Sequence, residues 1–427
     1  MIVIAGGWVL DPGRWNGEAD LWIRQGHVEA VMSPDAEVPT EALCIDATGL
    51  IVAPGFVDLH VHFREPGFEY KETIATGTAA AAAGGFTTVC CMPNTKPVND
   101  TSVVTGVIRA RAREAGLVAV CPIGAITKGV LGKALTDFHE LQSAGCVAVS
   151  DDGRPVMDDQ VMRQAMQRAQ ALGLPVVDHC EDVTLAGCGC MAEGPVARAL
   201  GVRGIPPEAE SRMVERDLIL AKDTGCHVHI AHISTAQAVL RVRRAKAEGV
   251  RVTAEACPHH FLLTDEAVQE WGTLAKMNPP LRRPDDVQAV RDGLCDGTID
   301  AIATDHAPHA EYEKQWGMNR APFGIVGLET ALGLTFRLVE EGVLSVESAI
   351  EKLTSAPARL FGLSKGTLAV GAEADVVMID HRREWTVDPE QFLSKGRNTP
   401  FAGWRLRGQV VRTFIGGTTV YQQSPGA

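Results

Sequence analysis

The sequence predicts an α/β protein: a (β/α)8 TIM-like barrel that carries a small β-sandwich module formed by both chain ends. Three patterns lead to this expectation. First, the middle of the chain alternates short apolar runs with Ala-rich amphipathic stretches. Second, there are eight of these apolar runs. Third, both flanks show strand patterns without long helical patterns. We therefore expect the module at residues 1–52 and 365–427, and the barrel at residues 53–364.

Each of the eight apolar runs is short and is followed by polar, often ionisable, side chains. Amphipathic stretches such as DDQVMRQAMQRAQALG and STAQAVLRVRRAKAEG lie between them and have the spacing of surface helices. Parallel strands with covering helices are what a barrel of this kind requires. In chain order the runs are LIVAPGFVDLHVHF, FTTVCCMP, VAVCPIGA, CVAVSDDG, LPVVDHCED, CHVHIAHIS, RVTAEACPHH and IDAIATDHAP.

The two flanks have a different character from the middle of the chain. DLWIRQGHVEAVM near the start, and ADVVMID and WRLRGQVVRTFIGGTTVY near the end, favour short strands joined by turns. The simplest assembly brings both flanks together as one β module beside the barrel.

Composition and charge exclude several classes of partner. The net charge of −13 argues against nucleic acid, because binding to phosphates needs a basic surface. Residues 73–95 carry no charge, but their Ala, Gly and Thr content favours a helix and a buried strand over a membrane span. MIVIAGGWVLDPG favours a first strand over a signal peptide. Eleven cysteines without such a signal indicate free thiols in a reducing compartment, so we expect a cytoplasmic protein.

Histidines and aspartates recur where the apolar runs end, which is where the active site of a parallel barrel is built. His60 and His62 lie two residues apart on a strand, so their side chains point to the same face. His227 and His229 alternate along the strand before His232, and their spacing predicts that both lie on the face opposite to His232. The other residues at these ends are Asn94, Asp151, Asp152, His179, His259, His260, Asp305, His306 and His309.

This set of side chains has the chemistry of a metal site. Imidazole nitrogen and carboxylate oxygen are donors that borderline metals such as zinc accept. His179, His232 and one or two aspartates could complete the set that His60 and His62 begin. Four histidines and two carboxylates exceed the needs of one tetrahedral ion and suit two metals that share a hydroxide.

The motifs VDLHVHFREPG, MPNT, SDDG, HCED, HIST, KMNPPLR, ATDHAPH and APFGIVGLET occur in this order. Together they resemble the amidohydrolase superfamily and, within it, the dihydroorotases of the long bacterial type. The resemblance runs from about Gly6 to near Gly417, which is almost the whole chain. It implies a zinc-dependent hydrolase of cyclic amides that interconverts N-carbamoyl-L-aspartate and L-dihydroorotate in pyrimidine synthesis.

The resemblance also implies ligands for two zinc ions. They are the residues at the strand ends: His60, His62 and Asp305 for one ion, and His179 and His232 for the other. Asp152 would bind at the metal pair, where many members of the superfamily carry a carboxylated lysine, and Asp151 is the weaker candidate. Asp305 would accept a proton from the attacking water and deliver it to the leaving ring nitrogen, so that it acts as base and then as acid.

A pocket for a substrate carboxylate is implied by Arg64, which lies two residues beyond His62 on the same face. A guanidinium there can bind a carboxylate through two parallel hydrogen bonds. The alternative for Arg64 is a surface ion pair with Glu65 or Glu69. The residues that the resemblance places at the substrate, besides Arg64, are His62, Asn94, Asn278, His309, Phe323 and Gly324.

Two further features of the sequence concern loops. The segment from His306 to Gly324 is long for a connection within a compact domain, and we expect it to move over the site as a lid. Lys71 and Glu72 follow the family motif, and we expect them to tie the loop without taking part in the chemistry.

Two other functions stay open. Allantoinases and dihydropyrimidinase-like hydantoinases share the His-x-His start and the flanking module, but they bridge their metals with a modified lysine and act on rings without a carboxylate. Arg64 and Asn94 therefore argue against them. A non-catalytic structural subunit of aspartate carbamoyltransferase would lack metal ligands, which this chain retains. We expect a homo-oligomer that acts on a small molecule, with that transferase as a candidate partner.

Overall fold

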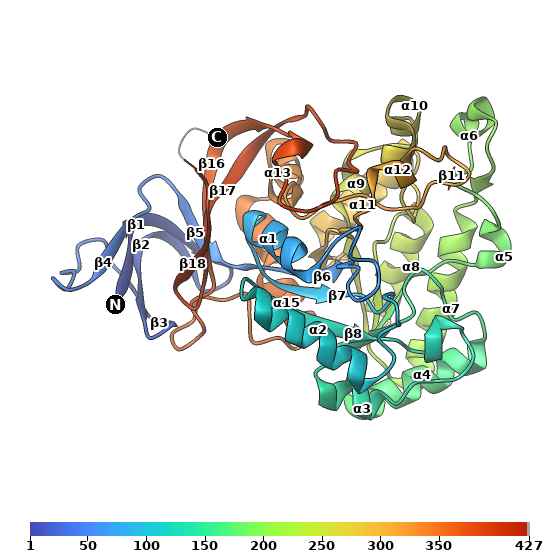
Figure 1. Cartoon of the computed structure of the whole chain (residues 1–427), viewed down its shortest axis with the longest axis horizontal. Helices are drawn as coiled ribbons and strands as arrows, with labels where there is room; N and C mark the ends of the chain where they lie inside the picture. Colours follow the sequence, from blue (N-terminus) through green and yellow to red (C-terminus); the bar gives the residue numbers. More distant parts are fainter. Residues whose placement is uncertain (425–427) are drawn as a thin grey trace.

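The computed structural model describes residues 1–424 and arranges eight parallel strands as a barrel (Figure 1). The strand order is β15-β14-β13-β10-β9-β8-β7-β6, so strands pair in the order in which the chain reaches them. The sheet nearly closes, because Val61 at the end of β6 forms a parallel bridge with His306 beyond β15. The strands are β6 (Phe56–Val61), β7 (Phe86–Cys91), β8 (Ala119–Gly124), β9 (Ala148–Ser150), β10 (Val176–Asp178), β13 (Val228–Ile230), β14 (Val252–Ala256) and β15 (Ala301–Ile302). The predicted (β/α)8 barrel is confirmed.

Helices lie between the strands, and α4 (Asp159–Leu172) shows why these segments are helical. The side chain of Asp158 accepts hydrogen bonds from two backbone N–H groups of the first turn. Gly173, with a φ of 70°, ends the helix in the left-handed conformation that glycine adopts at little cost. The buried residues repeat with helical spacing: Met162, Ala165, Met166 and Ala169.

The remaining longer helices pack in the same way around the barrel. They are α1 (Ile74–Ala83), α2 (Ser102–Ala115), α3 (Phe138–Ala144), α7 (Glu208–Thr224), α8 (Ala236–Ala247), α11 (Pro284–Asp296), α13 (Ala331–Glu340), α14 (Val346–Leu353) and α15 (Ser355–Leu360). Short elements occupy the connections: α5 (Val183–Ala186), α6 (Pro195–Leu200), α9 (Pro258–Leu262), α10 (Ala267–Trp271), α12 (Glu311–Lys314), the 3₁₀ turns η1 (Lys128–Val130), η2 (Gly272–Ala275) and η3 (Pro389–Gln391), and the strand pair β11 (Met191–Ala192) and β12 (Gly204–Ile205).

The two chain ends form a second eight-stranded sheet, which lies to the left of the barrel in Figure 1. Its order is β18-β17-β16-β5-β1-β2-β3, with β4 paired to β1, and the antiparallel pair β5–β16 joins the N-terminal part to the C-terminal part. The predicted module from both ends is therefore confirmed, while its exact boundaries stay a prediction. The strands are β1 (Ile2–Asp11), β2 (Trp15–Arg24), β3 (His27–Met32), β4 (Leu43–Asp46), β5 (Ile51–Pro54), β16 (Val376–Thr386), β17 (Arg405–Ile415) and β18 (Thr418–Gln422).

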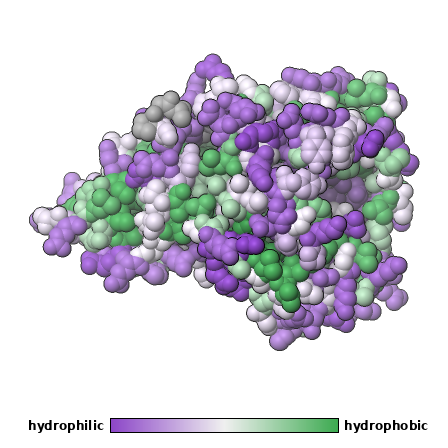
Figure 2. All heavy atoms as spheres, in the orientation of Figure 1, coloured by the Kyte–Doolittle hydropathy of each residue, from purple (hydrophilic) through white to green (hydrophobic). Residues whose placement is uncertain are grey.

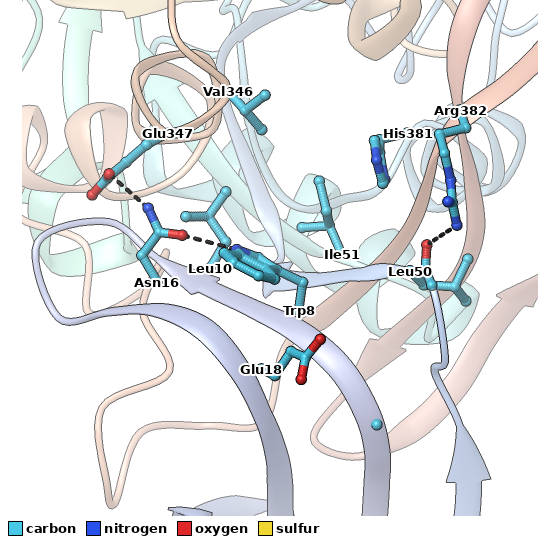
Figure 3. A pocket seen from close by; sticks show the side chains of 12 residues that line it. Trp8, Leu10, Asn16, Glu18, Leu50, Ile51, Val346, Glu347, His381 and Arg382 are labelled. Atoms are coloured by element: carbon cyan, nitrogen blue, oxygen red, sulfur yellow. Dashed lines mark hydrogen bonds between the residues drawn. The ribbon is translucent and has the colours of Figure 1, made fainter. Parts of the chain in front are cut away.

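A cavity of about 430 Å³ lies where this sheet meets helix α14 (Figure 3). Asn16 crosses the junction: its side chain accepts a hydrogen bond from Trp8 Nε1 at 2.8 Å and donates one to Glu347 Oε2 at 2.9 Å. Leu10, Ile51 and Val346 supply apolar walls. These contacts fasten the module to the barrel.

The uncharged residues 73–95 form helix α1 and strand β7, and every residue of that strand is buried. Within residues 1–424, none of the helices combines the length and the apolar character needed to cross a membrane. The face shown in Figure 2 is mainly hydrophilic, with hydrophobic patches over the end sheet and over part of the barrel. All eleven cysteines carry free thiols.

Candidate active site

Six of the residues predicted at the strand ends meet at the carboxyl end of the barrel, and all six are buried. Nε2 of His60 lies 3.5 Å from Asp152 Oδ1 and 3.6 Å from Asp305 Oδ1. Nε2 of His62 lies 3.1 Å from Asp305 Oδ1. On the other side of Asp152, Nε2 of His232 lies 3.6 Å from Oδ1 of Asp152. The same nitrogen lies 3.0 Å from Nδ1 of His179.

The hydrogen bonds of His60 show which of its nitrogens faces this centre. Nδ1 lies 2.9 Å from a carboxylate oxygen of Glu255, and a carboxylate accepts but does not donate, so Nδ1 carries the hydrogen. Nε2 has no hydrogen-bond partner, and it faces the carboxylates of Asp152 and Asp305. An imidazole nitrogen beside two carboxylates is a set of donor atoms that suits a metal ion bound between them.

Other donor atoms of the site are also buried without a partner within residues 1–424, namely Oδ1 of Asp152 and Nδ1 of His232. Among the predicted ligands, two groups of three residues each have one donor atom per residue within 4.8 Å of the others: His60 with His62 and Asp305, and His60 with Asp152 and His232. The arrangement therefore fits bound metal.

The two neighbouring aspartates of the SDDG motif point to different places. Asp151 accepts hydrogen bonds from the backbone N–H of Thr127, at 2.9 Å, and from its hydroxyl, and burial raises the pKa of Asp151 to about 6. Asp152 faces the histidines instead. Burial would raise the pKa of Asp152, but the nearby His60, His232 and His62 hold that pKa well below its ordinary value. The geometry thus favours Asp152 as the donor.

Three residues of the site have backbone angles in the left-handed region, which non-glycine residues rarely adopt. The φ angles are 62° for Arg64, 32° for His232 and 48° for Asp305. Such strain persists only where the surrounding structure fixes the backbone, and it is concentrated at functional sites. Each of these three residues follows a barrel strand, and its backbone conformation sets the direction of a side chain of the site.

Glu255 and His229 form a part of the site that the sequence analysis missed. Nε2 of His229 lies 3.1 Å from Oε2 of Glu255, whose Oε1 binds His60. The prediction that His229 lies on the face opposite to His232 is therefore wrong, since Glu255 joins it to His60 inside the barrel. Burial would raise the pKa of Glu255, but hydrogen bonds from both histidines hold it at about 2.

The residues predicted to bind substrate surround this centre. Oδ1 of Asn94 lies 2.9 Å from Nδ1 of His62. Asn278 Nδ2 lies 3.2 Å from Nε2 of His179. The guanidinium of Arg64 donates to the carbonyl of Pro308 through Nε at 3.2 Å, and its Nη2 lies 3.3 Å from Nε2 of His309.

The second half of this pocket comes from the segment after β15. Nε2 of His309 donates to the carbonyl of Phe323 at 2.7 Å. On the other side of the ring, Nδ1 of His309 accepts from Nζ of Lys71 at 3.2 Å. Burial, Arg64 and Lys71 lower the pKa of His309 to about 3, so the ring is neutral. Gly324 has a φ of 124°, and a Cβ there would lie 2.6 Å from that of Ala307, so only glycine fits.

Lys71 and Glu72 connect loops around the pocket. Besides His309, Lys71 Nζ contacts Glu313 at 3.0 Å. The buried carboxylate of Glu72 lies 3.3 Å from Nε2 of His306 and accepts a hydrogen bond from the hydroxyl of Ser394. This pair thus fastens the segment after β15 to the start of α1 and to the loop before β17.

A parallel barrel with histidine and aspartate donors at its strand ends is the architecture of the amidohydrolases. Residues 49–238 match the family described as Dihydro-orotase-like. The dihydroorotase of Anaeromyxobacter dehalogenans (strain 2CP-C) is 53% identical, over 99% of this chain and 98% of its own length. The dihydroorotase of Geobacter metallireducens is 50% identical over 99% of this chain and all of its own. The chain therefore belongs to the dihydroorotase family.

Solved structures with the same fold are more distant in sequence. An L-hydantoinase (dihydropyrimidinase) from Arthrobacter aurescens superposes with a TM-score of 0.89 at 27% identity, covering 99% of this chain and 96% of its own. A dihydropyrimidinase from Brevibacillus agri NCHU1002 gives a TM-score of 0.85 at 25% identity, with coverage of 98% and 95%. The fold is shared with these enzymes, while the sequence is much closer to the dihydroorotases.

Proposed function

We propose that the protein is a dihydroorotase, which interconverts N-carbamoyl-L-aspartate and L-dihydroorotate in pyrimidine synthesis. Relatives named dihydroorotase, about half identical over nearly the full length, support this activity. The observation that carries the proposal is the unpartnered Nε2 of His60, which faces two buried carboxylates. That arrangement suits a hydrolase whose reaction depends on metal.

Two zinc ions are the metals we propose, because the donors are imidazoles and carboxylates. His60, His62 and Asp305 would hold one ion, and His179 and His232 the other, and Asp152 would bind at this metal pair. When bound, the ions would lower the pKa of a shared water and supply hydroxide near neutral pH.

Asp305 is the group that we propose to move the proton. Burial would raise the pKa of Asp305, but contacts with His62, His60 and His232 hold it well below its ordinary value. The carboxylate is therefore ionised and can accept a proton from the attacking water. It would deliver this proton to the ring nitrogen as the amide bond breaks, and in ring closure it would act in the reverse order.

Arg64 is the residue we propose to bind the substrate carboxylate, together with Asn94 and His309. Within residues 1–424, Arg64 forms no ion pair with a carboxylate. Both alternative partners are engaged elsewhere: Glu65 lies 3.4 Å from Arg111, and Glu69 accepts from the backbone N–H of Gly67 at 2.7 Å. A half-buried guanidinium without a protein anion is suited to an anionic ligand. Asn278 and the backbone of Phe323 and Gly324 would contact the ring.

The test is a measurement of zinc per chain on protein purified without chelator, together with turnover of dihydroorotate, allantoin and dihydrouracil. We expect zinc and a clear preference for dihydroorotate. Preference for dihydrouracil would favour the hydantoinase alternative, which the shared fold supports. Absence of both zinc and turnover would refute the proposal.

The family resemblance supports further proposals about assembly and compartment. We propose a homo-oligomer with aspartate carbamoyltransferase as a candidate partner, and gel filtration with and without that transferase tests both points. The free thiols support a reducing, cytoplasmic location.

A further inference from the structure

Lys276 and Lys314 are buried lysines, each only 4% exposed, beside the pocket formed by Arg64 and His309. Within residues 1–424, neither ammonium lies within 4 Å of a carboxylate. A buried charge without an opposite charge is costly, so its retention calls for a compensating role.

Backbone carbonyls take the place of the missing carboxylates. Nζ of Lys314 donates to the carbonyls of Lys276 at 3.2 Å, Pro322 at 2.9 Å and Gly324 at 2.8 Å. An ammonium has three N–H donors, so all of them are used. These three carbonyls belong to two loops that lie far apart in the sequence.

Lys276 holds the outer part of the same segment. Its Nζ donates to the carbonyls of Met318 at 2.6 Å and Ala321 at 2.5 Å, and it lies 4.4 Å from the centroid of the Phe323 ring. Its own carbonyl accepts from the backbone N–H of Gly324 at 2.9 Å. The two lysines thus bind a stretch of residues 318–324 that has no regular secondary structure.

This stretch reaches the pocket through one hydrogen bond. The carbonyl of Phe323 accepts from Nε2 of His309, and the same nitrogen lies 3.3 Å from the guanidinium of Arg64. A shift of residues 322–324 would therefore move His309 and leave Arg64 without its neighbour. The six donor residues at the strand ends make no hydrogen bond with this stretch within residues 1–424.

We propose that Lys314 is a positioning residue that clamps the backbone of Phe323 and Gly324 against His309 and thereby sets the affinity for the substrate. The inference rests on the proposed function, which places Phe323 and Gly324 at the substrate ring. Lys276 holds the outer part of the clamp. The segment expected to act as a lid is thus fixed at its inner end by a buried ammonium.

The test compares Lys314→Met with Lys352→Met in the full chain. Lys352 is a buried lysine of α14 whose Nζ donates to the carbonyl of Ile299 at 2.8 Å, so both variants remove an ammonium that binds backbone. We measure steady-state kinetics with dihydroorotate and, without substrate, limited proteolysis of residues 315–324. Lys314→Met should raise KM by about tenfold or more, leave kcat within about threefold, and open the segment to protease. Lys352→Met should do neither.

The proposal is overturned if Lys314→Met leaves KM and cleavage as in the parent chain, or if Lys352→Met reproduces its effects. Should Lys314→Met fail to fold, Lys276→Met is judged by the same two measurements. If the parent chain does not turn over dihydroorotate, the proposed function fails, and the proteolysis comparison alone then decides whether the clamp exists.

Discussion

Oε1 of Glu255 lies 2.9 Å from Nδ1 of His60, and this hydrogen bond determines which nitrogen of the histidine faces the centre of the site. The other oxygen of Glu255 binds His229 at 3.1 Å, so the carboxylate is held from both sides. A carboxylate behind a metal-binding imidazole fixes the orientation of the ring and increases its basicity. We therefore expect Glu255 to influence metal affinity without touching the metal.

Glu255→Gln should weaken zinc binding by about 10- to 100-fold, because the amide has no charge and cannot accept hydrogen bonds from both histidines. Competition with a chelator of known affinity measures this directly. Glu329→Gln serves as the control, since Glu329 accepts from the backbone N–H of Leu393 and Ser394, away from the donor residues. Equal zinc affinity of Glu255→Gln and the parent chain would exclude this role.

Much of the site could be predicted because it follows from local rules. Alternation along a strand places His60 and His62 on one face. Residues that follow parallel strands of a barrel converge at one end, which brings His60, Asp152 and His232 together although no sequence pattern links them. The barrel itself follows from the alternation of strand and helix patterns.

The same local rules fail where the chain leaves the strand. Strand β13 ends at Ile230, and the φ of 32° at His232 breaks the alternation from which the position of His229 was inferred. Glu255 lies 195 residues from His60 and meets it only through barrel closure. The contacts of Lys314 could not be predicted either, because the carbonyls that it binds belong to irregular loops whose course the sequence pattern does not define.

Asp305→Ala should reduce turnover of dihydroorotate by at least about 10²-fold, because the proton then has no acceptor at the site. The melting temperature should show that the fold persists, and zinc analysis reports on the accompanying loss of a donor. Asp151→Asn is the neighbouring control, since the side chain of Asp151 accepts hydrogen bonds from Thr127 and does not face the histidines. Appreciable turnover by Asp305→Ala would refute the assignment as proton shuttle.

Arg64→Ala should weaken binding of dihydroorotate by about 2–5 kcal/mol, because a desolvated carboxylate loses its partner. Any turnover of dihydrouracil, which lacks the ring carboxylate, should change far less. Arg111→Ala removes an exposed arginine that pairs with Glu65 and Glu114, and it should leave both substrates unaffected. Steady-state kinetics of both variants with both rings measure the difference. An unchanged KM and rate in Arg64→Ala would remove this residue from the pocket.

Glu329 should make stability depend on pH in a direction opposite to that of a paired carboxylate. Burial raises its pKa from 4.5 to about 7, although two backbone N–H groups donate to it. Between these values the folded chain holds a proton that the unfolded chain has lost, so the contribution of Glu329 to stability falls as pH rises from about 4.5 to about 7 and is constant above that range. Glu329→Gln removes this dependence. The melting temperature of the variant relative to that of the parent chain should therefore rise as pH increases from about 4.5 to about 7. Parallel profiles of melting temperature against pH would show that Glu329 does not titrate there.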